Sequence, residues 1–333
     1  MKKTALFILL TIIAVLSAVW FFYRIETPET VLAPTISEPE KEKNIILLFT
    51  GDIMLDRGVE YMIKTEGKGD FKFPFLKIAE ELKKADILFG NLEGPISDKG
   101  TKVGSIYSFR ADPETIEGLN YAGFDILSFA NNHVFDYGRL AFKDTLERLK
   151  IAGIDYVGAG FNATEASSPI IREIDGTKIG FLAFSTLGPE SWKATENNSG
   201  INLISEKDIE KAKEIIKSAK EDVDILIVSL HTGEEYEMNP DELQISLAKS
   251  FVDAGTDLVV GHHPHVIQPT IAYENGWMAF SLGNFVFDQG FSKETMEGTL
   301  LKAVIEGKKI KEVIPIRIKM NEFFQPQVID KFK

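Results

Sequence analysis

The five histidines of this 333-residue chain all lie in short polar clusters that follow apolar, strand-like runs. Imidazole is the commonest nitrogen ligand for zinc, iron and manganese, and the amides and carboxylates beside these histidines offer further ligand atoms. The sequence therefore predicts a metal site, built from clusters that contain His133, His231, and the trio His262, His263 and His265.

Two carboxylates follow strand-like runs in the same way. Asp52 comes after the run Ile45 to Thr50, and Glu93 comes after the run Ala85 to Phe89. Glycine and aspartate also suit turns, so each segment taken alone is consistent with a plain turn. As parts of a metal site, Asp52 supplies a first carboxylate and Glu93 a second, which could bridge two ions.

The histidine clusters add nitrogen ligands and a candidate proton carrier. His133 follows Asn132, whose amide oxygen is a further ligand, and Asp136 could orient the imidazole. Taken alone, such a histidine is equally consistent with a structural role. In His263-Pro264-His265 an extended backbone would point both imidazoles the same way, which leaves His262 in a supporting role. Two ions that share a carboxylate activate water, so hydrolysis of a phosphoryl or acyl group is the expected reaction.

The N-terminus predicts a single transmembrane helix. Residues 5–23 carry no charge, and a helix of this length crosses a hydrocarbon core of about 30 Å. Lys2 and Lys3 precede the run, so the positive-inside rule keeps residues 1–4 in the cytoplasm. The alternative is a cleaved signal peptide, which the bulky residues from Trp20 to Tyr23 disfavour because cleavage sites contain small residues.

Composition distinguishes two regions after the span. Residues 24–43 are rich in proline and glutamate without an apolar period, which predicts a flexible stalk. Residues 44–333 are expected to form one domain, since a hydrophobic content of 44% is enough to bury a sizeable core. The net charge of −13 argues against nucleic acid as a partner. Without cysteines, the predicted location at the cell membrane, with the main domain extracytoplasmic, depends on the span alone.

The apolar runs predict an α/β fold. Five runs of strand length are apolar on both faces, which is typical of strands covered on both sides. Helices are predicted between them, over 206–221, after Pro113, after Pro240, and from Arg139 to Ala152. In such folds the loops after the carboxyl ends of the strands converge, so distant clusters meet there. Four of the five runs begin at an acidic residue, and these residues are Asp86, Asp125, Asp224 and Asp257.

In this order the clusters resemble the bacterial capsule synthesis protein CapA family, within the calcineurin-like metallophosphoesterase superfamily. The resemblance covers about Ile46 to Gln289 and includes the segment Ser281 to Gln289. It implies a four-layer αββα sandwich and a role in making, releasing or exporting poly-γ-glutamate or a related capsular polymer. The implied partners are an anionic polymer or phosphorylated envelope precursor and other membrane proteins of a capsule synthesis complex.

The resemblance also implies roles for single residues. Carried over by position, the metal ligands would be Asp52, Glu93, Asn132, His133, His231, His263 and His265, holding one or two ions of manganese, zinc or iron. The candidate catalytic residues are His133, Asp136, His231 and Glu235. The candidate substrate-binding residues are Arg57, Arg110, Tyr236 and Asn284. The two arginines would either hold an anionic group by bidentate hydrogen bonds or form structural ion pairs.

Three functions are compatible with these residues. The leading prediction is a membrane-anchored protein with a metal-dependent hydrolase-type site, either a phosphoesterase or a γ-glutamyl amide hydrolase or transferase. Met54 stands where the wider superfamily has a histidine ligand, with Asp56 as a candidate replacement. This favours, as an alternative, a non-enzymatic polymer-binding or assembly subunit that retains the fold. The third possibility is a general metal-dependent phosphodiesterase.

Overall fold

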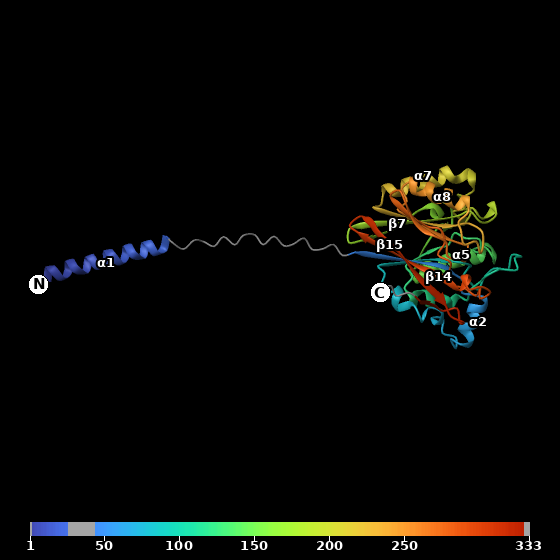
Figure 1. The fold of residues 1–333 in the computed structure, drawn as a ribbon, viewed down its shortest axis with the longest axis horizontal. Coiled ribbons are helices and arrows are strands. Elements are labelled where there is room, and N and C mark those ends of the chain that lie inside the picture. The colour runs from blue at the N-terminus through green and yellow to red at the C-terminus, as the bar shows by residue number, and fades with distance from the viewer. Residues whose placement is uncertain (1, 26–43, 330–333) are drawn as a thin grey trace. The chain divides into compact units, whose positions relative to one another are not determined.

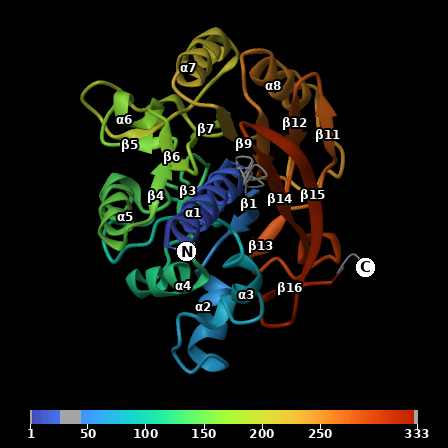
Figure 2. The same cartoon turned by 90° about the vertical axis from the view of Figure 1, so that its left-hand side faces the viewer.

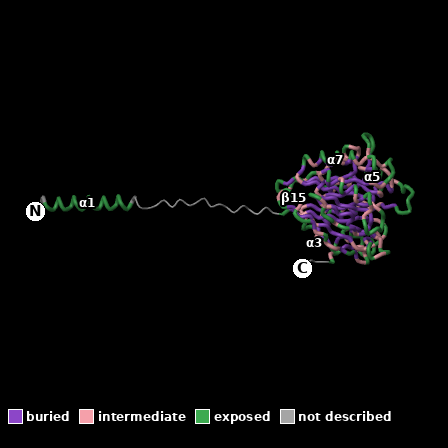
Figure 3. The backbone as a smooth tube through the Cα atoms, turned by 45° about the horizontal axis from the view of Figure 1, so that its top comes forward, coloured by how far each residue is buried: buried purple, intermediate pink, exposed green. Residues whose placement is uncertain are grey.

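The computed structural model describes residues 2–25 and 44–329. The chain divides into two units, Met1–Glu42 and Lys43–Lys333. The first contains helix α1 (Lys2–Ile25), whose segment Thr4–Tyr23 has a mean hydropathy of 2.7 and is fully exposed (Figure 3). This helix is a candidate membrane span by length and composition, although a signal sequence would share both properties. The predicted stalk over 24–43 lies outside the described residues, except for its first two residues, which continue α1.

Two β-sheets form the centre of the second unit (Figure 1). The larger sheet has the order β16-β15-β14-β1-β2-β3-β4, and β13 pairs with β1. Its strands are β1 (Ile45–Ile53), β2 (Ile87–Leu92), β3 (Ile126–Ser128), β4 (Asp155–Val157), β13 (Asn284–Val286), β14 (Glu297–Glu306), β15 (Lys309–Met320) and β16 (Pro326–Val328). The smaller sheet has the order β11-β12-β10-β9-β7-β6. Its strands are β6 (Ile170–Ile174), β7 (Thr177–Ser185), β9 (Ile225–His231), β10 (Leu258–His262), β11 (Thr270–Tyr273) and β12 (Gly276–Ala279).

Helices cover the outer faces of both sheets, which completes the four-layer αββα sandwich expected from the resemblance (Figure 2). The helices beside the larger sheet are α2 (Arg57–Thr65), α3 (Ala79–Leu82), α4 (Ile116–Ala122) and α5 (Gly138–Ala152). Those on the smaller sheet are α7 (Ile209–Glu221) and α8 (Glu242–Asp253). The short helix α6 (Ala163–Ser167) lies beside the two-stranded sheet of β5 (Ala159–Gly160) and β8 (Gly200–Ile201).

Successive residues of the central strands contribute to two different cores. Phe181 on β7 and Ile227 on β9 belong to the core between the sheets, whereas their neighbours Leu182 and Val228 belong to the core under α7 and α8. Because side chains alternate across a strand, a strand with both faces covered is apolar at nearly every position. The prediction that these runs are covered on both sides is confirmed.

The aspartates that precede four of the strands align the sheets. Each carboxylate accepts a hydrogen bond of 2.7–2.9 Å from a backbone N–H of the neighbouring parallel strand. The pairs are Asp86 with Ile46, Asp125 with Leu88, Asp224 with Lys178, and Asp257 with Leu226. These bonds fix the register at the amino ends of the strands, so the polar clusters at the carboxyl ends lie level with one another.

The predicted helices are present, with one difference in how a helix begins. Ser205 and Asp208 form the expected capping box before α7. For α8 the cap is Asp241, one residue after Pro240. Its side chain accepts a hydrogen bond from the backbone N–H of Gln244, and its own backbone N–H donates to the Gln244 side chain. Proline has no N–H to donate, so it remains outside the helix and the aspartate satisfies the first free N–H groups.

Candidate metal centre

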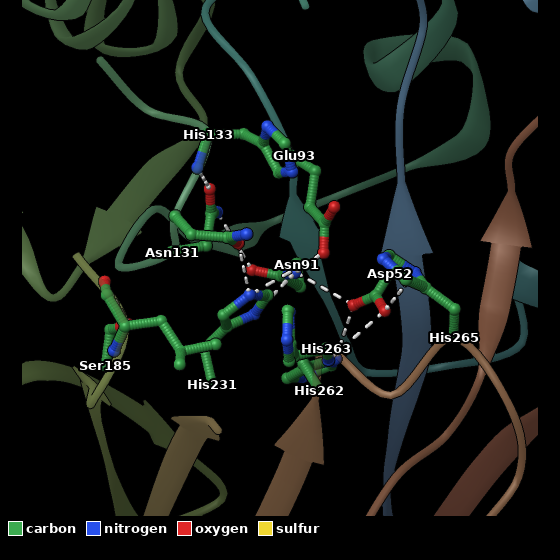
Figure 4. Close-up of polar contacts among 12 residues, drawn as sticks. Asp52, Asn91, Glu93, Asn131, His133, Ser185, His231, His262, His263 and His265 are labelled. Carbon is green, nitrogen blue, oxygen red and sulfur yellow. Dashed lines mark hydrogen bonds and ion pairs between the residues drawn. The ribbon is translucent and has the colours of Figure 1, made fainter. Parts of the chain in front are cut away.

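The polar clusters of both sheets meet at the carboxyl ends of the parallel strands (Figure 4). Asp52 lies near the end of β1, and Glu93 directly follows β2. His231 is the last residue of β9 and pairs in register with His262, the last residue of β10. The segments that suited turns in the sequence are therefore strand ends, since Gly51 and Asp52 lie within β1 and Gly90 lies within β2.

Asp52, Glu93 and His231 form one group of potential ligands, called here the inner group. Their ligand atoms lie within 4.8 Å of one another, and all three side chains are buried. Asn91 connects them, because its Nδ2 donates to Asp52 Oδ1 at 2.9 Å and to Glu93 Oε1 at 3.2 Å and lies 3.4 Å from His231 Nδ1. This set offers two carboxylates and one imidazole to a single ion.

Glu235, His263 and His265 form a second group, called here the outer group. Their ligand atoms also lie within 4.8 Å of one another, but Glu235 is exposed. The contact between His265 Nδ1 and Asp52 Oδ2, at 3.3 Å, joins the outer group to the inner one. The backbone N–H of His263 is also 3.3 Å from Asp52 Oδ2. Asp52, a member of the inner group, therefore connects the two groups.

The backbone of the His263-Pro264-His265 segment is a turn and not an extended strand. His263 has a φ of 101° and His265 a φ of 58°, values that few residues other than glycine adopt. The expectation that an extended backbone points the two imidazoles the same way is therefore wrong, because the segment is not extended. The rings do share one group, with centroids 5.8 Å apart, because the left-handed residues fold the segment back. Such conformations cost on the order of 1–3 kcal/mol each and cluster at functional sites.

The two buried carboxylates have opposite pKa shifts. Burial acts to raise the pKa of Asp52, but the imidazoles of His262 and His265, each 3.3 Å from one of its oxygens, hold that pKa well below its usual range. Burial and the negative charge of Asp52 raise the pKa of Glu93 well above its usual range. A second buried negative charge beside Asp52 is therefore unfavourable unless a cation accompanies it.

The histidines of the site also differ in the direction of their pKa shifts. Burial and the neighbouring His265 lower the pKa of His263 to about 3, and burial with His263 lowers the pKa of His231 well below its usual range. Burial acts to lower the pKa of His265, but the charges of Glu93 and Asp52 raise it to about 9. Neutral imidazoles at His231 and His263 can accept a metal ion without first losing a proton.

The residues present fit a metal ion. Among the described residues, Glu93 Oε2 and His263 Nδ1 are buried and lack a hydrogen-bond partner. Buried polar atoms are nearly always satisfied, so unpaired ligand atoms in a cluster of acids and imidazoles fit a cation as their partner. Nitrogen and carboxylate ligands suit zinc, iron and manganese.

His133 lies beside the two groups and forms a dyad with Asp136. His133 Nδ1 is 2.8 Å from Asp136 Oδ2, which also accepts the backbone N–H of Phe109 at 2.8 Å. The Phe109 ring packs against the imidazole, with centroids 4.2 Å apart. Asn132, predicted as a ligand, has its Oδ1 2.8 Å from His231 Nε2. His133 and Asn132 thus border the inner group, and their roles as ligands stay predictions.

The candidate substrate-binding residues are held by different partners. Arg57 makes a bidentate ion pair with Asp288, at 3.0 and 2.8 Å, and its guanidinium lies over the Phe109 ring. Arg110 donates to the carbonyls of Lys99 and Gly100 and stacks over Tyr137. Tyr236 is partly exposed beside His265, with ring centroids 6.2 Å apart, whereas Asn284 is buried.

Met54 is fully buried, and its sulfur lies 3.1 Å from the backbone nitrogen of Asp56. Asp56 caps α2, with one carboxylate oxygen accepting the N–H of Arg57 and the other that of Arg110. Both oxygens of the candidate replacement ligand therefore have backbone partners. Sequence reasoning overlooked Asn91, which joins the inner group, because an asparagine between glycine and leucine resembles a turn residue.

A sequence profile described as "Bacterial capsule synthesis protein PGA_cap" matches residues 46–289. The chain belongs to this family. It is 35% identical to "Capsule biosynthesis protein CapA" of Bacillus anthracis over 323 residues, which covers 93% of this chain and 75% of that protein. It is 34% identical to "PGA biosynthesis protein CapA" of Bacillus subtilis strain 168, over 81% of this chain and 70% of that protein.

Solved structures share the fold of this PGA_cap member at low sequence identity. A hypothetical protein from Thermus thermophilus matches with a TM-score of 0.51 and 14% identity, over 83% of this chain and 99% of that chain. A novel phosphatase from Mycoplasma pneumoniae matches with a TM-score of 0.50 and 17% identity, over 83% and 94%. The expected metallophosphoesterase-like fold is thereby confirmed.

Proposed function

We propose that this chain is a membrane-anchored, extracytoplasmic member of the PGA_cap family with a metal-dependent hydrolase-type site. Its substrate is a γ-glutamyl polymer or a phosphorylated envelope precursor. The observation that carries this proposal is the adjacency of the inner and outer groups, joined through Asp52 and His265 at 3.3 Å. Helix α1 supports the anchor, and the names of the two Bacillus relatives support the capsular context.

The chain supplies ligands for two ions. Asp52, Glu93 and His231 would hold one, and Glu235, His263 and His265 the other. Ions held there would polarise the bond to be cleaved and lower the pKa of bound water. Glu93, whose Oε2 has no hydrogen-bond partner within residues 2–25 and 44–329, is the carboxylate best able to reach a cation.

His133 is the candidate proton carrier. Asp136 accepts hydrogen bonds from the backbone of Phe109 and faces His133 Nδ1, so Nδ1 carries the hydrogen between them. His133 Nε2 is then free to exchange a proton with the leaving group. Contact with the Phe109 ring keeps the imidazole in that orientation.

The test uses the full chain purified in detergent. Metal content is measured by mass spectrometry, and activity is measured on a model phosphodiester with added manganese and on poly-γ-glutamate by chain length. We expect bound transition metal in the wild type and at least about 100-fold lower activity in His133→Ala and His265→Ala. A protein free of transition metal whose two variants remain fully active would sink the proposal. Asp125→Asn, at the opposite end of the larger sheet, is the matched control.

The second candidate function is a non-enzymatic polymer-binding or assembly subunit. Met54 and Asp56 favour it, because Met54 replaces the histidine of the wider superfamily and both carboxylate oxygens of Asp56 already accept a backbone N–H. Polymer production in cells that survives Asp52→Asn and His231→Ala, but is lost when α1 is removed, would support this function over hydrolysis.

The substrate preference separates a capsular enzyme from a general phosphodiesterase. Turnover of the model phosphodiester at rates far above cleavage of any γ-glutamyl or envelope substrate, with normal polymer production in a deletion strain, would favour the general enzyme. Loss of polymer on deletion, restored by the wild type and not by His133→Ala, would support the capsular one.

A further inference from the structure

A chain of hydrogen bonds leads from His265 to the exposed edge of the site. His265 Nδ1 lies 2.9 Å from Asn284 Oδ1. Asn284 Nδ2 donates to Gln289 Oε1 at 2.9 Å, and Gln289 Nε2 donates to the Tyr236 hydroxyl at 3.3 Å. Tyr236 directly follows Glu235, and its hydroxyl also contacts the Glu235 carboxylate. This series of hydrogen bonds thus starts at His265 and ends at Glu235, which are both members of the outer group.

The direction of these bonds is fixed by one backbone carbonyl. Asn284 Nδ2 also donates to the carbonyl oxygen of Thr295 at 3.0 Å, and a carbonyl can only accept. The asparagine amide therefore has its oxygen toward His265, so His265 Nδ1 carries the hydrogen. Asp52 Oδ2, 3.3 Å from the same Nδ1, is a second acceptor. His265 Nε2 is then the atom left for a ligand.

Gln289 lies at the centre of this series of hydrogen bonds, and its backbone is fixed by a hydrogen bond of its own. Its carbonyl accepts the Thr295 hydroxyl at 2.5 Å, and Thr295 is fully buried. On the other side, Tyr236 is 43% exposed and its ring meets the 66% exposed ring of Phe291 at 5.1 Å, edge to face. Tyr236 has a φ of 68°, and its N–H donates to the Pro264 carbonyl at 2.8 Å. A bulky residue in this conformation needs contacts such as these to hold it.

We propose that Gln289 is a positioning residue that holds His265, through Asn284, and Glu235, through Tyr236, in the geometry of one metal ion at the outer group. This inference rests on the proposed function, because it concerns ions that the outer group binds. Groups that hydrogen-bond to a metal ligand fix its ring orientation and raise metal affinity, typically by about 10–100-fold. Gln289 does this for an imidazole and a carboxylate at once, each through one intervening side chain.

The experiment is a metal titration of the full chain in detergent, with manganese for affinity and cobalt for its absorption spectrum. We expect Gln289→Leu to weaken the outer ion by about 10–100-fold and to change the cobalt spectrum, with the inner ion unchanged. Tyr236→Phe, which keeps the ring and removes only the hydroxyl, should weaken the outer ion by a smaller factor. The two losses should not add, since both variants interrupt the same series of hydrogen bonds.

Gln289→Glu is the rescue variant. A glutamate still accepts from Asn284 and so keeps His265 in place, but it takes the single hydroxyl hydrogen of Tyr236 away from Glu235, so it should recover only part of the lost affinity. The matched control is Gln325→Leu, because this buried glutamine instead donates to the carbonyl of Phe73. Equal weakening by Gln325→Leu would overturn the inference, as would a Gln289→Leu protein that folds and binds both ions with wild-type affinity.

The outcomes also separate this inference from the function on which it rests. A wild-type chain that binds no ion contradicts both. A wild type that binds two ions, with an outer ion insensitive to Gln289→Leu and Tyr236→Phe, contradicts only the positioning role. Thermal unfolding of each variant shows whether it is folded, and Tyr236→Phe provides the test if Gln289→Leu does not fold.

Discussion

The inner and outer groups contain the same kinds of ligand but differ in how the chain holds them. Asp52, Glu93 and His231 lie on or directly after strands β1, β2 and β9, and all are buried. The outer group lies on loops, includes the exposed Glu235, and depends on left-handed residues at His263 and His265. Strand ends in a packed sheet move little, whereas a loop opens at lower cost. We therefore expect the inner group to bind the tighter, more slowly exchanging ion.

Asp52→Asn should have the largest effect, because Asp52 belongs to the inner group and also contacts His265 of the outer group. Removing one partner of a buried charged pair costs about 3–5 kcal/mol, so the free energy of unfolding should fall by that amount. Both ions should be lost as well. Urea unfolding and metal analysis provide the measurements, with Asp125→Asn as the control. If one ion remains with wild-type affinity, the two groups do not depend on Asp52 together.

Comparing His231→Ala with Glu235→Gln should reveal the difference between the groups. His231→Ala should abolish the inner ion, while Glu235→Gln should weaken only the outer ion, by about 10–100-fold. Manganese titrations that resolve the two binding steps provide the measurement. An outer ion that binds more tightly than the inner one in the wild type, or equal losses at both steps in each variant, would contradict the contrast.

The pH dependence of metal binding should distinguish the outer group from the inner one. The pKa of His265 is raised to about 9, so metal must displace a proton from it at neutral pH. Affinity at the outer group should therefore rise by about tenfold per pH unit between about pH 7 and 9 and then level off. Calorimetry in buffers of different ionisation enthalpy counts the released protons. Affinity that is constant over this range would contradict the raised pKa.

The raised pKa of His265 also predicts how the stability of the metal-free protein changes with pH. A raised pKa means that protonated His265 stabilises the folded state. That stability is complete below the unfolded pKa of about 6.5 and is lost as the pH rises through about 9. Urea unfolding of chelator-treated protein between these values should show the decline, and His265→Asn should remove it.

Much of the fold could be predicted from the sequence, because the signals were local. The strand before His231 is apolar at every position except Ser229, and Ser205 with Asp208 is a capping box that needs no tertiary contact. Strands β14 and β15 were not predicted. They form an antiparallel pair in which β15 alternates buried and exposed residues over part of its length, and they carry no polar cluster at their ends.

The candidate ligands could be predicted because their residue types are costly to bury without a purpose. The roles of Asn91 and Gln289 could not be predicted, since the role of an amide side chain depends on the groups to which it hydrogen-bonds in the folded protein. The conformation of the His263-Pro264-His265 segment was also beyond the sequence, because residues other than glycine adopt positive φ only when surrounding contacts impose it.

The sequence by itself determined the α/β layers and the clusters of acids, amides and histidines, because strand patterns and ligand types are properties of single segments. Only the tertiary structure decided how the clusters divide. It placed Asp52 beside histidines more than 200 residues away in the sequence and paired Arg57 with Asp288. It also gave both oxygens of Asp56 backbone hydrogen-bond partners. Distances between segments, and the electrostatic interactions that depend on them, arise only when the two sheets pack together.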